Sequence, residues 1–328
     1  MAHYSIGIDI GGTTAAYGLL NGEGQIVYRK KHPSNSHCPP GEFFDEVAEN
    51  INDILRDNKI GKENLKGVGI GMPSFILFEE GLIIKTVNLT NICDFPARDY
   101  LIKKLGGIPV VLGNDAHAAA IAEHRYGAGR GFNNMLYCPV GTGISSGIII
   151  NGSLFRGSYG WAGESGHMIL TPDDGVMCGC GNEGCFMSWT SGSMIIRHIE
   201  KWMEAGEKSI ITGIAGSEKL NCSHLAAAYN SGDLLARRAI AQMVKLLGVW
   251  IYNLYTTLNI NCFVFGGGLI KMFNELNDNG NGGLLAAVKE EFNKYNKNSM
   301  PVYFKEAELS NSMSGDDFGI IGAAELLF

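Results

Sequence analysis

The stretch YSIGIDIGGTTAAYGLL, residues 4–20, decides the fold that this sequence predicts. Apolar residues alternate with small ones on both sides of Gly11-Gly12, and a further alternating run, QIVYRK, follows Asn21-Gly22. A period of two is typical of β-strands, and Asn-Gly between apolar runs is a strong hairpin signal. The opening of the chain is therefore predicted to form three short strands in succession, joined by tight turns.

The same unit returns at residues 136–156, LYCPVGTGISSGIIINGSLFR, where a strand again runs into a Gly/Thr turn. A unit that occurs twice is what a duplicated domain leaves in a sequence. Helical periodicity follows each copy, over 43–57 and from near Asp115 in the first, and over 240–258 in the second. The prediction is an α/β protein of two duplicated domains, residues 1–115 and 116–316. A closing helix at about 317–328 is expected to pack back on the first domain.

Composition excludes several classes of protein. The chain has 328 residues, of which 45% are apolar and 18% charged, and no apolar run reaches the roughly 20 residues that span a bilayer. Its start lacks the basic and apolar regions of a signal peptide, so we expect a cytoplasmic protein with no membrane partner. The net charge of -7 argues against a nucleic-acid partner, because such surfaces need clustered positive charge. Small-molecule partners are expected instead.

Two Gly/Thr loops stand at the first turn of each repeat, DIGGTT at 9–14 and VGTGISSG at 140–147. Glycine lets backbone N–H groups approach an anion, and the threonine hydroxyls add donors. Neither loop is a Walker A motif, and one glycine turn alone would be interpreted as a plain tight turn. Two matching loops together with FGGG at 265–268 favour phosphate binding.

His167 and three cysteines, Cys178, Cys180 and Cys185, lie within one short segment. Four soft or borderline ligands suit tetrahedral Zn²⁺. Disulfides fit badly because Cys178 and Cys180 are too close for easy pairing and the expected compartment is reducing, which leaves a cluster of free thiols as the alternative. Four protein ligands leave no position open for water, so the zinc would be structural and would fix the His167 ring toward substrate.

In the combination of these motifs the sequence resembles the ROK family of sugar kinases and sugar-responsive repressors, within the actin-like ATPase superfamily. The resemblance covers nearly the whole chain, through DIGGTT, GNDAHAAA, VGTGISSGIIINGSLFRG, GWAGESGH, CGCGNEGC, FGGG and GIIGAAELLF. It implies two actin-like (ribonuclease H-like) domains with a nucleotide and sugar cleft between them, and a zinc motif of the form described above. It also implies contacts to ATP by Asp9, Gly11, Gly12, Thr13, Gly141, Thr142, Gly143, Gly266 and Gly267.

The resemblance also assigns roles at the sugar. It places substrate contacts at Asn88, Asn114, Asp115, Glu164 and His167. Asp115 would be the catalytic base that takes the proton of the acceptor hydroxyl. Without the flanking match, an Asp at a helix start would be interpreted as an N-cap. Mg²⁺ would bridge the ATP phosphates, with Asp9 acting through water.

The function that follows is an ATP-dependent kinase that transfers the γ-phosphoryl group to a hydroxyl, at C6, of a hexose or hexose derivative. The alternative is a catalytically silent sugar sensor or regulator of the same family. Only eight residues precede Asp9, which leaves no room for the DNA-binding segment of a repressor. A homodimer or homotetramer is a possible assembly.

Three positions depart from the family pattern. Thr14 stands where many members have Lys, so a lysine contact to phosphate is absent, and His117 replaces a frequent Asn, a change interpreted as peripheral. Met187 stands where many members have a Glu that accepts hydrogen bonds from sugar hydroxyls, and a thioether is a weak acceptor. Either the substrate is less polar or bulkier at that point, or a neighbour such as Ser188 or a water supplies the acceptor.

Overall fold

The structure is a computed structural model and describes residues 3–87, 89, 91–172, 176–274, 276, 283–298, 300–308 and 317–328. The chain forms two compact units. The first comprises Met1–Asn133, Gly147–Ala162 and Glu308–Phe328, and the second comprises Asn134–Ser146 and Gly163–Ala307. The helix that begins at Asp115 belongs to the first unit, whereas the predicted division at residue 115 assigned it to the second domain. The boundary between functional domains stays a prediction.

The first sheet has the strand order β3-β2-β1-β4-β8. Its antiparallel strands β1 (Tyr4–Ile10), β2 (Thr14–Leu20) and β3 (Ile26–Pro33) confirm the three strands predicted at the start of the chain. The strands β4 (Leu65–Met72) and β8 (Val110–Asn114) extend the sheet in parallel with β1. The carboxyl ends of these parallel strands meet at one edge of the sheet, which is the edge where open α/β sheets bind ligands.

The second sheet repeats this order as β11-β10-β9-β12-β13. Its strands are β9 (Met135–Pro139), β10 (Gly147–Ile150), β11 (Ser153–Leu154), β12 (Cys262–Gly266) and β13 (Tyr303–Glu306). β12 pairs in parallel with both β9 and β13, as β4 does with β1 and β8 in the first sheet. The equal strand order confirms the α/β fold that the sequence repeat predicts.

A smaller third sheet has the order β5-β6-β7, and its strands are antiparallel. They are β5 (Ser74–Leu77), β6 (Leu82–Thr86) and β7 (Cys93–Phe95). The sequence analysis did not predict this sheet. Its strands are short, and alternation over so few residues gives little signal.

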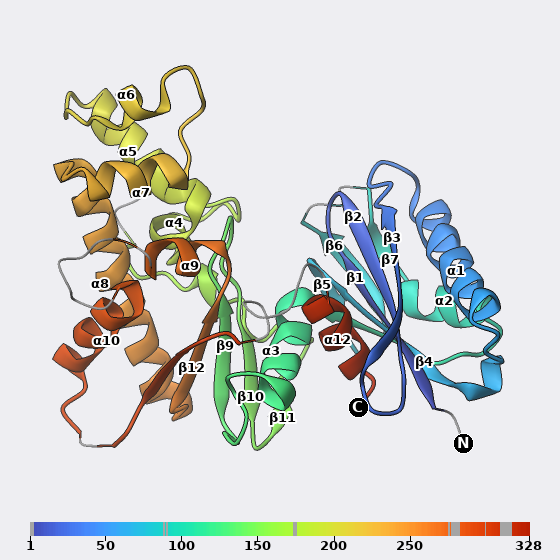
Figure 1. Cartoon of the computed structure of the whole chain (residues 1–328). Helices are drawn as coiled ribbons and strands as arrows, with labels where there is room; N and C mark the ends of the chain where they lie inside the picture. Colours follow the sequence, from blue (N-terminus) through green and yellow to red (C-terminus); the bar gives the residue numbers. More distant parts are fainter. Residues whose placement is uncertain are drawn as a thin grey trace. The chain divides into compact units, whose positions relative to one another are not determined.

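Helices cover both faces of the first sheet (Figure 1). On one face, α1 (Pro40–Asp57) buries its predicted apolar stripe in the main core of the unit. On the other face, α12 (Asp317–Glu325) crosses the sheet at Gly7, where a Cβ would lie only 1.9 Å from the carbonyl oxygen of Ile320. The closing helix therefore packs directly on the strand backbone, which only a glycine at this position allows.

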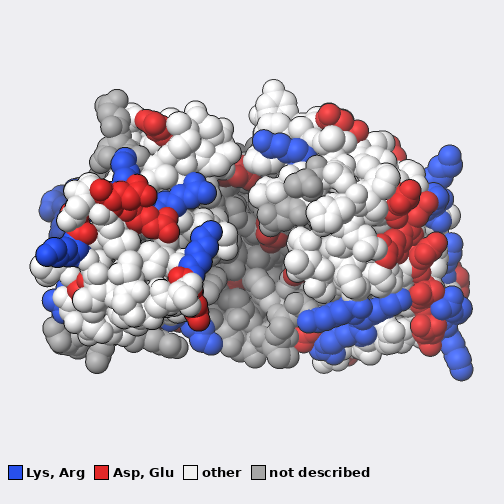
Figure 2. Space-filling view, turned by 90° about the horizontal axis from the view of Figure 1, so that it is seen from above, with Lys and Arg blue, Asp and Glu red and all other residues white. Residues whose placement is uncertain are grey.

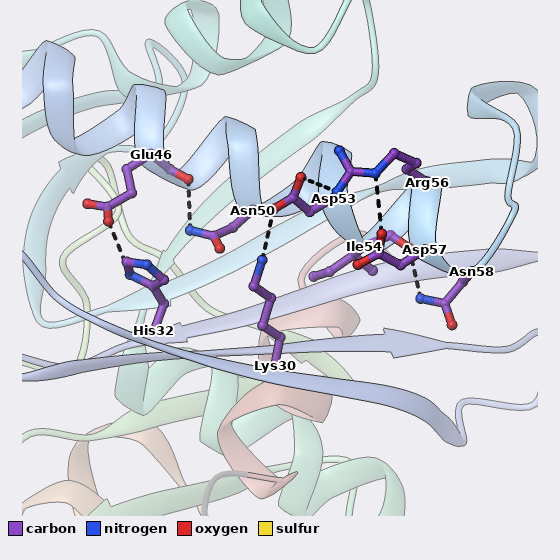
Figure 3. Close-up of polar contacts among 9 residues, drawn as sticks. All are labelled: Lys30, His32, Glu46, Asn50, Asp53, Ile54, Arg56, Asp57 and Asn58. Carbon is purple, nitrogen blue, oxygen red and sulfur yellow. Dashed lines mark hydrogen bonds and ion pairs between the residues drawn. The ribbon is translucent and has the colours of Figure 1, made fainter.

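Charged side chains join the outer strand β3 to α1, as Figure 3 shows. Lys30 Nζ lies 3.1 Å from the carboxylate of Asp53, and His32 Nδ1 lies 3.2 Å from that of Glu46. Arg56, one turn after Asp53, binds the same carboxylate over 2.8 Å. Exposed ion pairs contribute about 0–1 kcal/mol each, so this layer adds little to stability. Charges along an edge strand do discourage pairing with a second sheet.

Helices dominate the second unit. The longest is α8 (Leu234–Leu258), whose apolar stripe is buried as predicted and whose N-terminus is capped by Asp233. Its Trp250 stacks on Phe186 with ring centroids 4.8 Å apart. The other helices of the chain are α2 (Ala97–Lys104), α3 (Asp115–Tyr126), α4 (Met187–Thr190), α5 (Gly192–Glu204), α6 (Ile211–Ala215), α7 (Cys222–Asn230), α9 (Gly268–Asn274) and α10 (Gly283–Tyr295), with short 3₁₀ turns at Lys62–Asn64 and Ser165–His167.

The surface carries both signs of charge. Lysine and arginine side chains lie among aspartates and glutamates over the face shown in Figure 2. Within the described residues, no helix is both long enough and apolar enough to cross a membrane.

Candidate functional site

The first Gly/Thr loop connects β1 to β2 and closes on itself, with the N–H of Gly11 donating to the carbonyl oxygen of Thr14 over 2.9 Å. The N–H groups of Gly12 and Thr13 at its tip make no hydrogen bond within the part of the chain that the structure describes. Asp9 precedes the loop at the end of β1. Two free backbone donors near a carboxylate suit an anion that is accompanied by a hydrated cation.

The second Gly/Thr loop, residues 140–147, resembles the first loop in its backbone hydrogen bonds. The N–H of Gly141 donates to the carbonyl oxygen of Gly143 over 3.0 Å, and its own carbonyl accepts from Gly192 over 2.8 Å. The N–H groups of Thr142 and Gly143 have no protein acceptor among the described residues. A Cβ on Gly141 would meet nothing within 4 Å, so the loop backbone faces open space. An anion can therefore approach the loop backbone at Gly141 without displacing a side chain.

The third glycine motif lies beside the second loop. β12 runs parallel to β9 with Gly266 opposite Pro139, so the loops that follow the two strands leave the sheet at the same edge. The N–H of Val140 donates to the carbonyl oxygen of Gly266 over 2.9 Å. Gly267 has φ 90°, and a Cβ there would lie 2.4 Å from the carbonyl oxygen of Val140. The structure thus brings together the predicted nucleotide contacts of residues 141–143 and 266–267.

The predicted sugar segment, residues 163–167, packs against the continuation of the same loop. The N–H and the hydroxyl of Ser146 reach the carbonyl oxygen of Gly163 over 2.8 and 2.9 Å. Gly163 has φ 103°, and a Cβ there would lie 1.9 Å from the carbonyl oxygen of Ser146. Sequence reasoning missed this contact, although the glycines of AGESGH were a signal that backbones approach closely here. The phosphate loop and the sugar segment are therefore mechanically joined.

The His167 ring is shared between two neighbours. Its Nε2 lies 4.0 Å from Oε2 of Glu164, and both side chains are half-buried. Its Nδ1 faces the other way, 3.6 Å from Sγ of Cys178. A metal ion on Nδ1 would leave Nε2 able to hydrogen bond beside Glu164. A carboxylate acceptor and an imidazole donor on one segment suit neighbouring hydroxyl groups of a sugar.

The four predicted metal ligands form one cluster. The ligand atoms of His167, Cys178, Cys180 and Cys185 all lie within 4.8 Å of one another, and Sγ of Cys180 is 3.5 Å from Sγ of Cys185. A tetrahedral zinc ion with Zn–S bonds of roughly 2.3 Å separates its sulfur ligands by roughly 3.8 Å. The donor set and its spacing therefore fit this metal. All eight cysteines, which lie in the described residues, are free, so the structure contains none of the disulfides considered above.

Asp115 begins α3, but it is not the cap of that helix. Asn114 takes this position, and its Oδ1 accepts from the N–H of Ala116 over 2.8 Å. The Asp115 side chain is exposed to solvent, and one of its oxygens accepts from the same N–H over 2.9 Å. Surrounding protein raises the pKa of the Asp115 carboxyl by desolvation, against the lowering effect of the Ala116 N–H. Water access and a raised pKa together suit a group that takes up protons.

His117, two residues after Asp115, is not peripheral in its contacts. It is buried in α3, and its Nε2 lies 2.7 Å from the carbonyl oxygen of Ala162. Because a carbonyl only accepts, Nε2 carries the proton. Burial lowers the pKa of His117, while the bond to Ala162 opposes the shift. The first turn of α3 is thereby tied to the residue that precedes the sugar segment.

Two further positions singled out from the sequence are Asn88 and Met187. Asn88 lies outside the described residues, so its predicted sugar contact stays a prediction. Met187, the first residue of α4, lies against the second phosphate loop, with Cε 3.6 Å from where a Cβ on Gly143 would be. The alternative that Ser188 supplies the missing acceptor is disfavoured, because Ser188 is fully buried.

Comparison with known proteins places these motifs in a family. The sequence pattern of the ROK family matches residues 5–328. The curated glucokinase of Halalkalibacterium halodurans is 32% identical over 323 residues, which cover 98% of this chain and 94% of that protein.

Solved structures give the same result. A ROK hexokinase from Thermus thermophilus matches with a TM-score of 0.81 and 27% identity, covering 98% of this chain and 97% of that one. A ROK family glucokinase from Streptomyces griseus, solved with glucose and AMPPNP, matches with a TM-score of 0.73 and 27% identity over 98% of both chains.

Proposed function

The chain belongs to the ROK family, and from this premise we propose that it is an ATP-dependent sugar kinase. The enzyme transfers the γ-phosphoryl group of ATP to the C6 hydroxyl of a hexose or hexose derivative. Full-length similarity to proteins named glucokinase supports the enzyme class.

The pair of Gly/Thr loops is the observation that carries this proposal. Among the residues that the structure describes, two backbone N–H groups of each loop have no protein acceptor, at Gly12 and Thr13 and at Thr142 and Gly143. Phosphoryl transfer has little covalent work for a protein to do and depends on positioning and on charge stabilisation. Donors fixed by tight turns supply both, because they need no reorganisation when charge develops on the phosphate oxygens.

Asp115 is the proposed base. The hydroxyl oxygen at C6 forms a bond to the γ-phosphorus while the bond from that phosphorus to the bridging oxygen of ADP breaks. The hydroxyl proton passes to the Asp115 carboxylate, and ADP leaves with the bridging oxygen. Asn114, Glu164 and His167 are proposed to hold the sugar hydroxyls, so that the acceptor oxygen stays aligned.

The chain's acidic and sulfur ligands define the proposed metal sites. Asp9 is proposed to hold Mg²⁺ through water, and this ion would neutralise phosphate charge when bound. His167, Cys178, Cys180 and Cys185 are proposed to hold a structural Zn²⁺. The role of the zinc ligands is to fix the imidazole ring of His167 and, through it, the sugar segment.

A coupled assay of ADP release tests the proposal. The full chain is supplied with ATP and Mg²⁺ and a panel of hexoses, N-acetylhexosamines and ketohexoses, and the phosphorylated carbon of any product is identified by NMR. The proposal predicts sugar-dependent ADP release and a 6-phosphate product. Sugar binding without sugar-dependent ADP release across the panel would instead favour the silent sensor.

A further inference from the structure

A cavity of about 270 Å³ lies in the first unit, formed by residues that have no role in the proposed reaction. One wall is the turn between β5 and β6, with Phe78, Glu79 and Glu80. The other wall is the segment after β11, with Arg156 and Tyr159. The volume is just under the roughly 300–1,000 Å³ of pockets for drug-sized ligands, so it suits a single small ring.

The walls are held together by specific contacts. Trp161 Nε1 donates to the carbonyl oxygen of Ile76 over 2.9 Å, and the indole packs edge-on against Phe75 with centroids 5.7 Å apart. Gly160 has φ 90°, and a Cβ there would lie 3.0 Å from that same carbonyl oxygen. The segment after β11 is thus docked on the β5–β6 turn, so the cavity is part of the fold and not a loose gap.

Within the described residues, the side chains of Arg156, Glu79 and Glu80 make no hydrogen bond to the protein. The guanidinium of Arg156 lies 4.1 Å above the ring of Phe78, and within the described residues it makes no hydrogen bond or ion pair. Glu79 and Glu80 are exposed and add acceptor oxygens. The Tyr159 side chain is 65% exposed and leans on Trp161, which leaves most of its ring face open.

This combination is the chemistry of neutral carbohydrate recognition. Aromatic faces pack on the apolar C–H faces of a sugar ring, while a guanidinium donates to hydroxyls and carboxylates accept from them. A phosphate or another anion is disfavoured, because the two carboxylates oppose it.

The cavity is connected to the proposed active site along the chain. Ala162, which follows Trp161, is bonded to His117, two residues after the proposed base Asp115. Glu164, a proposed sugar ligand, follows Ala162 by two residues. We propose that this cavity is a carbohydrate subsite for a neutral sugar ring beyond the phosphoryl acceptor, so that the enzyme accepts a disaccharide or a bulky glycoside. The link to the substrate rests on the proposed kinase function, whereas the binding of a sugar ring does not.

Calorimetric titration of the full chain without ATP tests the subsite. The probes are glucose, maltose, cellobiose and sucrose, and the variants are Tyr159→Ala and Arg156→Met. Matched controls are Tyr303→Ala and Arg130→Met, which change an exposed tyrosine and an exposed arginine outside the cavity. We expect at least one disaccharide to bind about tenfold or more tightly than glucose. Both cavity variants should weaken that binding about tenfold, as the loss of a charge-assisted bond or a stacking partner predicts, and the controls should change it less than twofold.

The results of these titrations and of the kinase assay distinguish the proposed subsite from the proposed kinase activity. A second equivalent of free glucose that binds the parent but not Arg156→Met would identify a free sugar as the occupant and would support the carbohydrate site without the disaccharide. Cavity variants that behave like their controls for every probe would overturn the subsite. Glucose phosphorylation with neither disaccharide binding nor a second equivalent of bound glucose would overturn the subsite alone, and disaccharide binding without any phosphorylation would overturn the proposed kinase alone.

Discussion

The sequence alone does not decide whether Asn114 or Asp115 caps α3, and therefore which of the two side chains is available for catalysis. An Asp at a helix start is usually a cap, and this reading competes with a catalytic role. In the structure, Asn114 caps α3 and Asp115 occupies the first helical position with an exposed carboxylate. Cap geometry depends on backbone angles that a sequence pattern does not contain. The carboxylate of Asp115 is therefore available for chemistry.

Replacing Asp115 by Asn should lower kcat by about 10² to 10⁴-fold, because general-base catalysis contributes that much. The melting temperature should hardly change, since the cap remains. Replacing Asn114 by Ala should instead cost about 0.5–2 kcal/mol of folding free energy. Steady-state kinetics and thermal melts check both expectations, and near-parental turnover by Asp115→Asn would sink the assignment.

The pH profile gives a second readout for the same residue. A base must be deprotonated, so activity is lost as the pH falls through its pKa. Because the pKa of Asp115 is raised, kcat/KM of the parent should begin to fall at a higher pH than an ordinary aspartate, of pKa about 3.9, would give. The acidic limb should be missing from the residual activity of Asp115→Asn. An acidic limb that survives unchanged in the variant would assign it to another group.

The side chain of Met187 is expected to influence which sugar binds near the second phosphate loop. Because Ser188 is fully buried and a thioether is a weak acceptor, a Met187→Glu variant would supply a charged acceptor at this segment. We expect the variant to gain kcat/KM for glucose relative to the other sugars of the panel, since a charge-assisted bond contributes about 1.5–3 kcal/mol. If the parent already prefers glucose and the variant only loses activity, Met187 serves packing and the substrate inference is wrong.

At the scale of elements, sequence periodicity predicted individual strands and helices but not the contacts between segments far apart in the chain. The strands β1–β3, the stripe of α1 and the long helix α8 follow from patterns of two or 3.6 residues, and the structure confirms them. The clustering of the four metal ligands also follows from their spacing. The contact of Ser146 with Gly163 and that of His117 with Ala162 join segments far apart in sequence, and no local pattern encodes such a pairing.

The junction of the phosphate loop with the sugar segment can be tested at Gly163. A Gly163→Ala variant has strain from a positive φ and a Cβ that would lie 1.9 Å from the carbonyl oxygen of Ser146. Gly152→Ala is its control, because that glycine has φ 77° with nothing near the added methyl. The strain of a positive φ at a residue other than glycine alone costs about 1–2 kcal/mol of folding free energy. We therefore expect both variants to lose stability, and only Gly163→Ala to raise the sugar KM several-fold as well. Equal effects in the two variants would show that the junction has no role in substrate binding.

The metal cluster is tested by Cys180→Ser, with Cys93→Ser as the control at an exposed cysteine outside the cluster. The parent should contain one zinc per chain, measured by mass spectrometry of protein purified under reducing conditions without chelator. The variant should lose the metal and melt at a lower temperature, because the free energy of metal binding contributes to the free energy of folding. Its sugar KM should rise more than its kcat falls, through a misplaced His167. A parent without zinc would contradict the structural metal site.

At the scale of the whole molecule, the match of residues 5–328 to the ROK family carries the family assignment, and the site residues carry the proposed function. Equal sheets in both halves explain why the two Gly/Thr loops occupy equivalent turns. A fold by itself does not fix a reaction, because one fold hosts many functions. Whether this chain phosphorylates a sugar or only binds it depends on the free N–H groups of the loops and on Asp115.

The most direct test of the account is the transfer of labelled γ-phosphate from ATP to a hexose, measured with the full chain and Mg²⁺ beside a reaction without sugar. We predict that the label appears in sugar phosphate, that its release as inorganic phosphate stays low, and that Asp115→Asn slows the transfer about 10² to 10⁴-fold while it still binds the sugar. Label that appears only as inorganic phosphate, or sugar binding with no transfer for any member of the panel, would contradict it.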